Sequence, residues 1–76
     1  MNLSEKLKNA REKAGLSQKD VAEALNISRQ SVSKWETGKA YPDIDNLIIL
    51  SELYDVSVDY LIKNNQESSL KKTVEN

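Results

Sequence analysis

The sequence predicts an all-α protein, a compact bundle of five short helices. Three observations lead to this fold class. Apolar residues recur at spacings of three and four along five segments, which is the period of an amphipathic helix. Ser, Asp or Asn stands before these segments, and glycine follows two of them, as at helix ends. The chain has 76 residues, a length typical of one small domain with a marginal core.

The first helix is expected over residues 2–14. Asn2 or Ser4 would cap its start, because either side chain can accept a hydrogen bond from a free backbone N–H group. Gly15 would stop it, since glycine readily takes the left-handed conformation that ends helices. The stripe expected to face the core is Leu3, Leu7, Ala10 and Ala14.

The second helix is expected over residues 18–25, and a tight turn joins it to the next. Ser17 is its predicted N-cap, and Asp20 stands at the capping-box position. Leu16 precedes the cap as a hydrophobic staple. Asn26 is the turn residue, because asparagine tolerates the left-handed conformation better than most residues other than glycine. The expected inward face is Val21, Ala22 and Leu25, with Ile27 under the turn.

The third helix is expected over residues 28–36, with Ser28 as its cap, and it carries a polar face. A rotation of about 100° per residue follows from about 3.6 residues per turn. Counted from Arg29, the side chain of Ser33 lies at about 40°. Gln30 lies at about 100° and Lys34 at about 140°. These residue types read guanine and adenine edges in the major groove of DNA, which makes this helix the candidate reader.

The opposite side of the third helix is apolar. Val32 and Trp35 lie at about 300° and 240° on the same count. Trp35 is therefore interpreted as a core residue and not as a platform for base stacking. On its own the polar face could equally be a solvated helix surface, so its meaning depends on the pattern around it.

Two further helices complete the predicted bundle. Gly38 would end the third helix, and Pro42 would keep the loop over residues 39–42 extended. Asp43 would cap a fourth helix that runs to about residue 54, and Ser57 would cap a fifth. Their expected inward residues are Ile44, Leu47, Leu50, Tyr54, Val56, Val58, Leu61 and Ile62. The domain would then span residues 1–63, followed by a polar tail over residues 64–76 that is either loose or weakly helical around Leu70 and Val74.

Composition and charge narrow the function classes. The chain has no cysteine and no histidine, which argues against a disulfide framework and removes common metal ligands and general bases. The polar start has no apolar signal core and no run reaches membrane-spanning length, so a cytoplasmic protein is expected. The net charge is −1, yet it is unevenly distributed. Residues 11–42 hold six cations against four acids, whereas residues 43–62 hold five acids and no cation. Such a polarised domain can turn its basic side to phosphate, although chance scatter would produce the same numbers.

Apolar, small and turn residues at these spacings resemble the phage repressor/Cro family of XRE-type helix-turn-helix proteins. The likeness covers about residues 3–62 and includes Leu16-Ser17-Gln18, Val21-Ala22, Leu25, Asn26-Ile27-Ser28, Val32, Trp35-Glu36, Gly38, Pro42, Leu47, Leu50 and Val56-Ser57-Val58-Asp59-Tyr60-Leu61. The chain departs from the family pattern at Asn26, where glycine is frequent, and at Ser51, where alanine is frequent. The resemblance implies a lambda-repressor-like bundle of five helices, in which the second and third form the helix-turn-helix.

The resemblance also implies roles for particular residues. Bases would be read by Ser28, Arg29, Gln30, Ser33 and Lys34. Phosphates would be held by Gln18, Ser31, Lys39, Tyr41 and Asn46. Besides holding a phosphate, Gln18 would brace the first reader residue. Arg11 would form an ion pair with Glu36 that orients the reader, although from its position alone Arg11 is a solvated charge beside the apolar stripe.

The function expected from the resemblance is sequence-specific binding of double-stranded DNA by a transcriptional regulator. A repressor is expected before an activator. A homodimer on a two-fold operator is expected, because one recognition helix buries too little surface to hold a specific site. Ile49 and Leu53 are the candidate dimer residues, since they lie beside the core stripe of the fourth helix. No catalytic residue, metal or cofactor is expected. A regulatory protein partner is left open, and the protein is expected to associate with the nucleoid when it is bound to DNA.

One alternative class remains besides a DNA-binding regulator. A protein-interaction module could keep this fold without DNA affinity, and the net charge of −1 is its main support. An enzyme is not expected, because the chain lacks histidine, cysteine and a glycine-rich phosphate loop.

Overall fold

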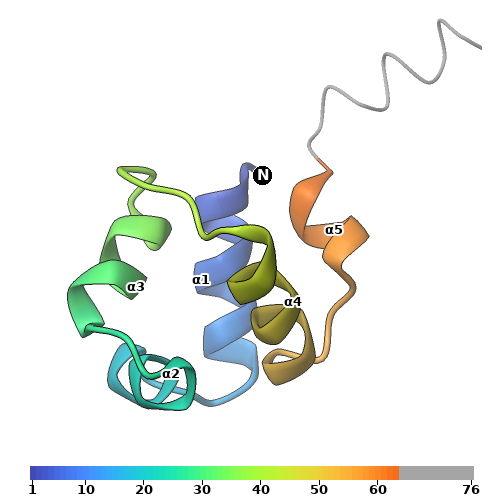
Figure 1. Cartoon of the computed structure of the whole chain (residues 1–76). Coiled ribbons are helices and arrows are strands. Elements are labelled where there is room, and N and C mark those ends of the chain that lie inside the picture. The colour runs from blue at the N-terminus through green and yellow to red at the C-terminus, as the bar shows by residue number, and fades with distance from the viewer. Residues whose placement is uncertain (64–76) are drawn as a thin grey trace, which may run out of the picture.

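A computed structural model of the chain describes residues 1–63 and is all-helical over that range (Figure 1). The helices are α1 (Leu3–Lys13), α2 (Gln18–Leu25), α3 (Arg29–Glu36), α4 (Ile44–Leu53) and α5 (Val58–Ile62). The prediction of a bundle of five short helices is therefore confirmed. The predicted tail over residues 64–76, with its weak helix around Leu70 and Val74, lies outside the described residues.

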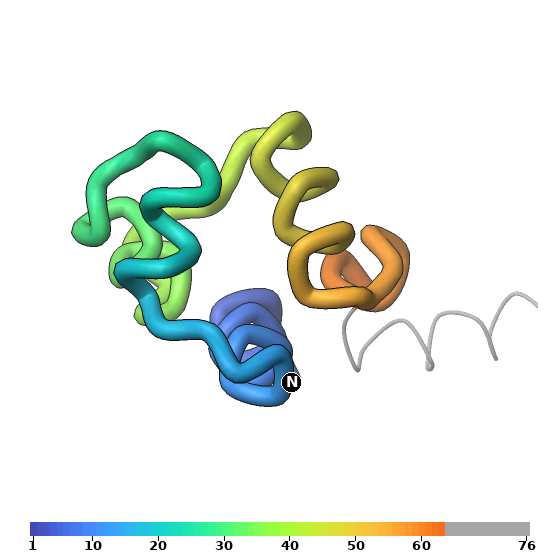
Figure 2. Tube along the Cα trace, turned by 90° about the horizontal axis from the view of Figure 1, so that it is seen from below, coloured from blue at the N-terminus to red at the C-terminus, as the bar shows by residue number. Residues whose placement is uncertain are grey.

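The helices form two groups around α1. In Figures 1 and 2, α2 and α3 lie on one side of the molecule and α4 and α5 on the other, with α1 between them. α3 packs on both α1 and α2, while α5 packs on α1 and α4. This arrangement places α3 at one edge of the molecule, away from α5.

A polar side chain caps the start of every described helix. Each cap accepts a hydrogen bond from the backbone N–H three residues later, which satisfies one of the free donors of the first turn. At α1 the cap is Asn2 and not Ser4, because Glu5 completes a capping box there by accepting from the Asn2 backbone N–H. The predicted caps Ser17, Ser28, Asp43 and Ser57 all occur.

The core is continuous across the bundle. Its largest fully buried side chains come from all five helices: Leu7, Val21, Val32, Leu50 and Leu61. Three residues expected to face inward are instead exposed: Ala14, Ile44 and Ile62. Ala14 follows the last residue of α1, and Ile44 is the first residue of α4, so neither has core packed against it. Ile62 lies about 100° around α5 from buried Leu61, which turns it away from α1 and α4.

Lys6 is a buried cation that sequence reasoning did not single out. Its Nζ donates to the backbone oxygen of Tyr60 at 2.9 Å and also to that of Lys63. The ammonium group lies 5.0 Å from the centroid of the Tyr60 ring. Lys6 therefore ties α1 to the carboxyl end of α5, where a positive charge is favourable for the helix dipole.

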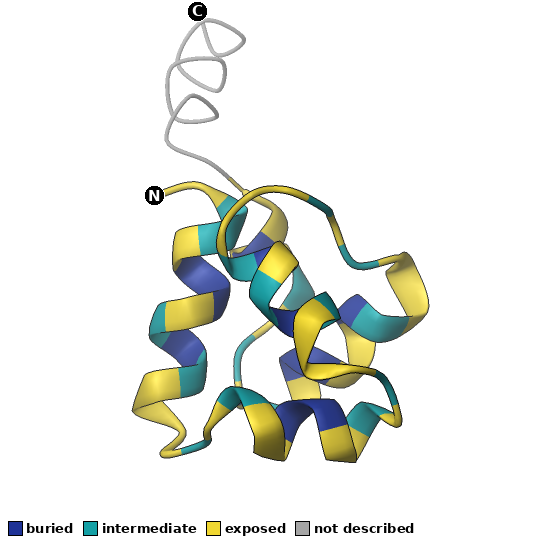
Figure 3. Cartoon of the chain, turned by 90° about the vertical axis from the view of Figure 1, so that its left-hand side faces the viewer, coloured by how far each residue is buried: buried dark blue, intermediate teal, exposed yellow. Residues whose placement is uncertain are grey.

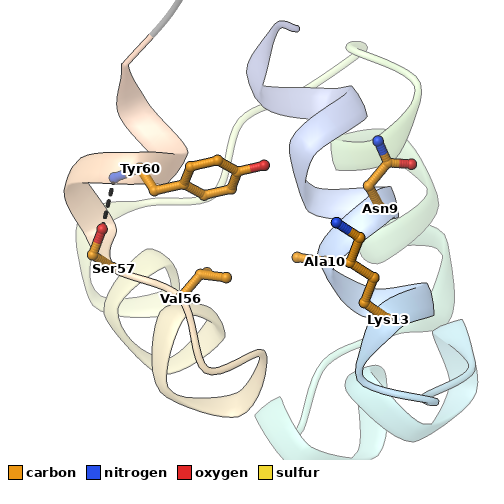
Figure 4. Close-up of a pocket in the computed structure, with 6 residues that line it drawn as sticks. All are labelled: Asn9, Ala10, Lys13, Val56, Ser57 and Tyr60. Carbon is orange, nitrogen blue, oxygen red and sulfur yellow. Dashed lines mark hydrogen bonds between the residues drawn. The ribbon is translucent and has the colours of Figure 1, made fainter.

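A groove remains on the α1–α5 side of the molecule. In Figure 4 the ring of Tyr60 points from α5 toward α1, and the hydroxyl oxygen of Ser57 accepts from the Tyr60 backbone N–H at 2.9 Å. The residues lining this groove are Asn9, Ala10, Lys13, Val56, Ser57 and Tyr60. None of them belongs to α2 or α3.

Candidate DNA interface

The turn between α2 and α3 has a tight, left-handed corner. Asn26 adopts φ 57° and ψ 47°, the conformation for which asparagine is among the better-suited residues. The backbone N–H of Ile27 donates to the oxygen of Ala22 at 2.9 Å, which closes the end of α2. Ser28 then caps α3 by accepting from the backbone N–H of Ser31. Asparagine thus fills this corner where the family pattern often has glycine.

α3 is anchored through its apolar side. Val32 is 1% exposed and Trp35 is 8% exposed, so both belong to the core, as predicted. α3 contacts α1 and α2, and Val21 and Ala22 of α2 are buried in the same core as Val32 and Trp35. The rotation of α3 about its own axis is therefore determined by packing.

The outward side of α3 is open to solvent. Arg29, Gln30 and Lys34 are exposed, and no other residue of the described chain covers them. Ser28 is also exposed, whereas Ser33 is half-buried. Figure 3 turns the α2–α3 side toward the viewer and shows exposed residues interleaved with buried ones along these helices. The structure brings the predicted base-reading residues together at one edge of the molecule.

A shallow hollow lies beside the end of α3. Its lining residues are Gln30, Ser33, Lys34, Thr37 and Lys39. Thr37 was not singled out from the sequence, and its hydroxyl donates to the backbone oxygen of Ser33 at 3.0 Å. That bond uses the Thr37 hydroxyl hydrogen to close the carboxyl end of α3, which explains why threonine suits this position.

The predicted phosphate-binding residues lie on α3 itself and on the segments around it. Lys39 and Tyr41 are exposed in the loop after α3. Asn46 is half-buried in the first turn of α4, and its backbone N–H donates to Asp43 at 2.9 Å. Ser31 is half-buried, with its hydroxyl 3.1 Å from that of Ser28.

An ion pair joins α1 to the end of α3. Arg11 donates from Nε to Oε2 of Glu36 at 2.7 Å and from Nη2 to Oε1 at 3.1 Å. The pair that the resemblance implies is thus present, with side chains 11% and 3% exposed. Gln18 adds a third donor, since its Nε2 lies 3.0 Å from Oε1 of Glu36. Arg11 also donates to the backbone oxygen of Leu16 at 2.9 Å. One guanidinium therefore links α1, the loop before α2 and the end of α3.

The electrostatics around this ion pair follow from burial and from the carboxylate. The hydrogen bond to Glu36 raises the pKa of Arg11 above its ordinary value. Burial raises the pKa of the Tyr54 phenol well above its usual range, and the charge of Glu36 adds to the rise. Arg11 and Tyr54 therefore both keep their protons at neutral pH.

Two further features were sought in the described part of the chain, a metal site and a membrane-spanning helix. Residues 1–63 contain no group of three or more His, Cys, Asp or Glu side chains placed to hold a metal ion. None of the helices in this range has the length and apolar character that crossing a lipid bilayer requires.

Comparisons with known proteins agree on one family. A helix-turn-helix family model matches residues 7–61. The HTH-type transcriptional regulator ImmR of Bacillus subtilis (strain 168) is 45% identical, over 97% of this chain and 63% of its own length. The HTH-type transcriptional activator BcrR of Enterococcus faecalis is 37% identical, over 96% of this chain and 36% of its own length. The chain therefore spans less than two thirds of either relative.

A solved structure shares the fold. The crystal structure of the P22 c2 repressor protein in complex with synthetic operator 9T superposes with a TM-score of 0.77 at 28% identity. The match covers 83% of this chain and 96% of that one.

Proposed function

The chain belongs to the XRE-type helix-turn-helix family of DNA-binding transcriptional regulators, which are not enzymes, and we propose that it binds a specific double-stranded DNA sequence through α3. The observation that carries this proposal is the anchoring of α3. Val32 and Trp35 are buried, so Arg29, Gln30 and Lys34 face outward together. A helix held in this way can enter a major groove with its polar face toward the bases.

The roles proposed on α3 follow from hydrogen-bonding geometry. Arg29 pairs bidentately with guanine and Gln30 with adenine, each discriminating by about 1–3 kcal/mol. Lys34 reaches a base or a phosphate. Ser28 and Ser33 complete the base-reading set with short hydroxyl groups that accept or donate.

The proposed phosphate contacts position the reader without selecting sequence. Gln18 opens α2, where free backbone N–H groups and the helix dipole favour an anion. Its Nε2 donates to Glu36, the last residue of α3, and not to a residue at the start of the reader helix, so bracing of the first reader residue stays a prediction. The other proposed phosphate contacts are Ser31, Lys39, Tyr41 and Asn46.

We further propose a homodimer on a two-fold operator, with half-sites about 34 Å apart. Ile49 is 42% exposed on α4, whereas Leu53 is half-buried and packs against the core. The contact would be made by α4 and α5, which lie on the opposite side of α1 from α3 in Figure 1. Such a dimer leaves both recognition helices free.

The regulatory outcome that we propose is repression, by occlusion of polymerase at the operator. The structural neighbour P22 c2 is a repressor, whereas the relative BcrR is an activator. Whether a regulator of this kind represses or activates transcription therefore depends on where its operator lies. A regulatory protein partner acting on the acidic side would relieve binding. We propose that the regulator itself works in the cytoplasm and associates with the nucleoid when it is bound to DNA.

Selection from a pool of random duplex DNA tests the proposal directly. The expected product is a two-fold sequence with half-sites one helical turn apart, whose affinity falls steeply with salt because phosphate contacts release counterions. Arg29→Ala should relax the sequence choice, whereas Lys8→Ala, which changes an exposed cation of α1, should not. Failure to enrich any duplex at low salt would refute DNA binding.

The second candidate function is a protein-interaction module with the same fold. The net charge of −1 and the five acids of residues 43–62 favour it, because a nucleic-acid-binding domain is usually basic. The same DNA selection separates the two functions, since an interaction module enriches no sequence.

A further inference from the structure

The surface of the described chain divides into two chemically different halves. Among residues 1–63 seven large apolar side chains are exposed, and six of them lie between residues 41 and 62. Five acids and no cation occupy residues 43–62. α3, by contrast, exposes Arg29 and Lys34 and no large apolar side chain. Exposed apolar surface and negative charge therefore coincide on the side of α4 and α5.

On α4 these two properties combine in a single stripe. Asp45, Ile48, Ile49 and Glu52 stand at positions i, i+3, i+4 and i+7, which places them on one face of the helix. Both isoleucines are 42% exposed, and both acids are exposed. The buried residues Leu47, Leu50 and Ser51 occupy the opposite face. We call the four outward residues the α4 stripe.

The acids of the α4 stripe are free to meet a partner. Among residues 1–63 the carboxylates of Asp45 and Glu52 take part in neither of the two ion pairs, Arg11–Glu36 and Asp59–Lys63. They also accept no hydrogen bond from another described residue. A binding partner therefore displaces only water from them.

We propose that the α4 stripe is a docking surface for a basic amphipathic helix of another protein. The two isoleucines form the apolar centre, and a carboxylate lies one turn away on each side. An incoming helix with apolar residues at its middle and Lys or Arg at both ends matches this pattern, and helix-on-helix packing of this kind is a recurrent mode of peptide recognition. The two carboxylates favour a helix with basic ends over one with acidic ends, because opposite charges attract across an interface.

A second copy of this chain fits the α4 stripe poorly. Antiparallel packing about a two-fold axis brings Asp45 toward the second copy's Glu52, and parallel packing brings each acid toward its own counterpart. Like charges meet in both arrangements, which is unfavourable across an interface. The dimer proposed above uses Ile49, Leu53 and residues of α5 and shares only Ile49 with the stripe, so Ile48 separates the two proposals.

The test uses the full chain and two synthetic helical peptides. Both carry leucines at matching positions in the middle, and one has lysines at both ends where the other has glutamates. Isothermal titration at low salt should give at least about tenfold tighter binding of the lysine peptide. Ile48→Ser should weaken that binding about tenfold, whereas Ile62→Ser, which changes a more exposed isoleucine outside the stripe, should leave it unchanged.

Charge reversal makes the test specific. The double variant Asp45→Lys/Glu52→Lys should prefer the glutamate peptide, and circular dichroism confirms that each variant is folded. Equal affinity for the two peptides, no binding of either, or unchanged preference in the double variant would overturn the proposal. Sedimentation supplies a further outcome that would overturn the proposal. If the wild type self-associates and Ile48→Ser abolishes this self-association, the stripe belongs to a second copy of the chain. None of these measurements involves DNA, so they leave the proposed DNA binding untouched.

Discussion

Arg11 and Glu36, 25 residues apart in the chain, meet in a bidentate ion pair with Nε–Oε2 and Nη2–Oε1 distances of 2.7 and 3.1 Å. Glu36 is the last residue of α3, so the pair links the reader helix directly to α1. The carboxylate also accepts from Gln18 at the start of α2. One buried charge therefore joins the three helices that determine how α3 is presented.

Breaking this ion pair should be costly, and removing both partners should cost less. Arg11→Met leaves the 3%-exposed Glu36 charge without its cation, for which we expect a loss of about 3 kcal/mol in the free energy of unfolding. The double variant Arg11→Met/Glu36→Leu should recover much of this loss, because no unpaired charge remains. Urea denaturation measures both values. A cost for Arg11→Met of about 0.5 kcal/mol or less, as at an ordinary surface site, would contradict this account.

Arg29 should determine sequence choice without affecting stability. Arg29→Ala removes an exposed side chain, so the free energy of unfolding should change by less than about 0.5 kcal/mol. Discrimination at one base pair of the selected operator should fall by about 1–3 kcal/mol. Titration of operators substituted at each position measures this effect. Lys39→Ala is the matched control, because loss of a phosphate contact weakens all sequences alike and lowers the salt slope by about one.

The dimer proposal predicts a change in mass. Ile49→Glu and Leu53→Glu should each shift sedimentation at micromolar concentration from dimer to monomer, because a charge would be buried in an apolar contact. Ile49 is the more informative site, since it is 42% exposed and its substitution leaves the core intact. Leu53 packs partly against the core, so its variant needs a check of folding by circular dichroism. An unchanged mass of the folded variants would rule this contact out.

The capping box of α2 predicts a pH dependence. The backbone N–H of Ser17 donates to the Asp20 carboxylate at 2.9 Å, and this bond lowers the Asp20 pKa below its ordinary 3.8. Because folding lowers this pKa, ionised Asp20 stabilises the fold above pH 3.8, and its contribution disappears as the pH falls through the native value. The destabilisation caused by Asp20→Asn should therefore be present at neutral pH and shrink in acid. Urea titrations across this range measure it, and a difference independent of pH would show that the ionised carboxylate is not responsible.

The positions of the helices followed from local chemistry. Caps such as Ser17, Ser28 and Asp43 accept hydrogen bonds from backbone donors three residues later. The starts of these helices can therefore be predicted from the sequence alone. The two faces of α3 were predictable for the same reason, because Val32 and Trp35 differ from Arg29 and Lys34 in polarity at a known angular spacing. Choosing between Asn2 and Ser4 required geometry, since both side chains are able to cap α1.

Contacts between distant segments were harder to predict. The burial of Lys6 depends on two backbone oxygens 54 and 57 residues away, and lysine at an α1 position otherwise indicates a solvated charge. The exposure of Ile44 depends on where α4 begins, which a periodic pattern locates only approximately. The exposure of Ile62 depends on which face of α5 packs on α1 and α4. The Arg11–Glu36 pair was expected from the family resemblance and not from the spacing of the two residues.

The fold class, the helix starts and the polarity of α3 can be derived from the residue order, because capping and helical periodicity act over a few neighbouring residues. The meeting of Arg11, Gln18 and Glu36, the bonds of Lys6 at the end of α5 and the exposure of the α4 stripe emerge only in the folded bundle. These features depend on how helices pack, and packing is a property of the whole chain: burial and hydrogen bonds between distant residues exist only once the bundle has formed.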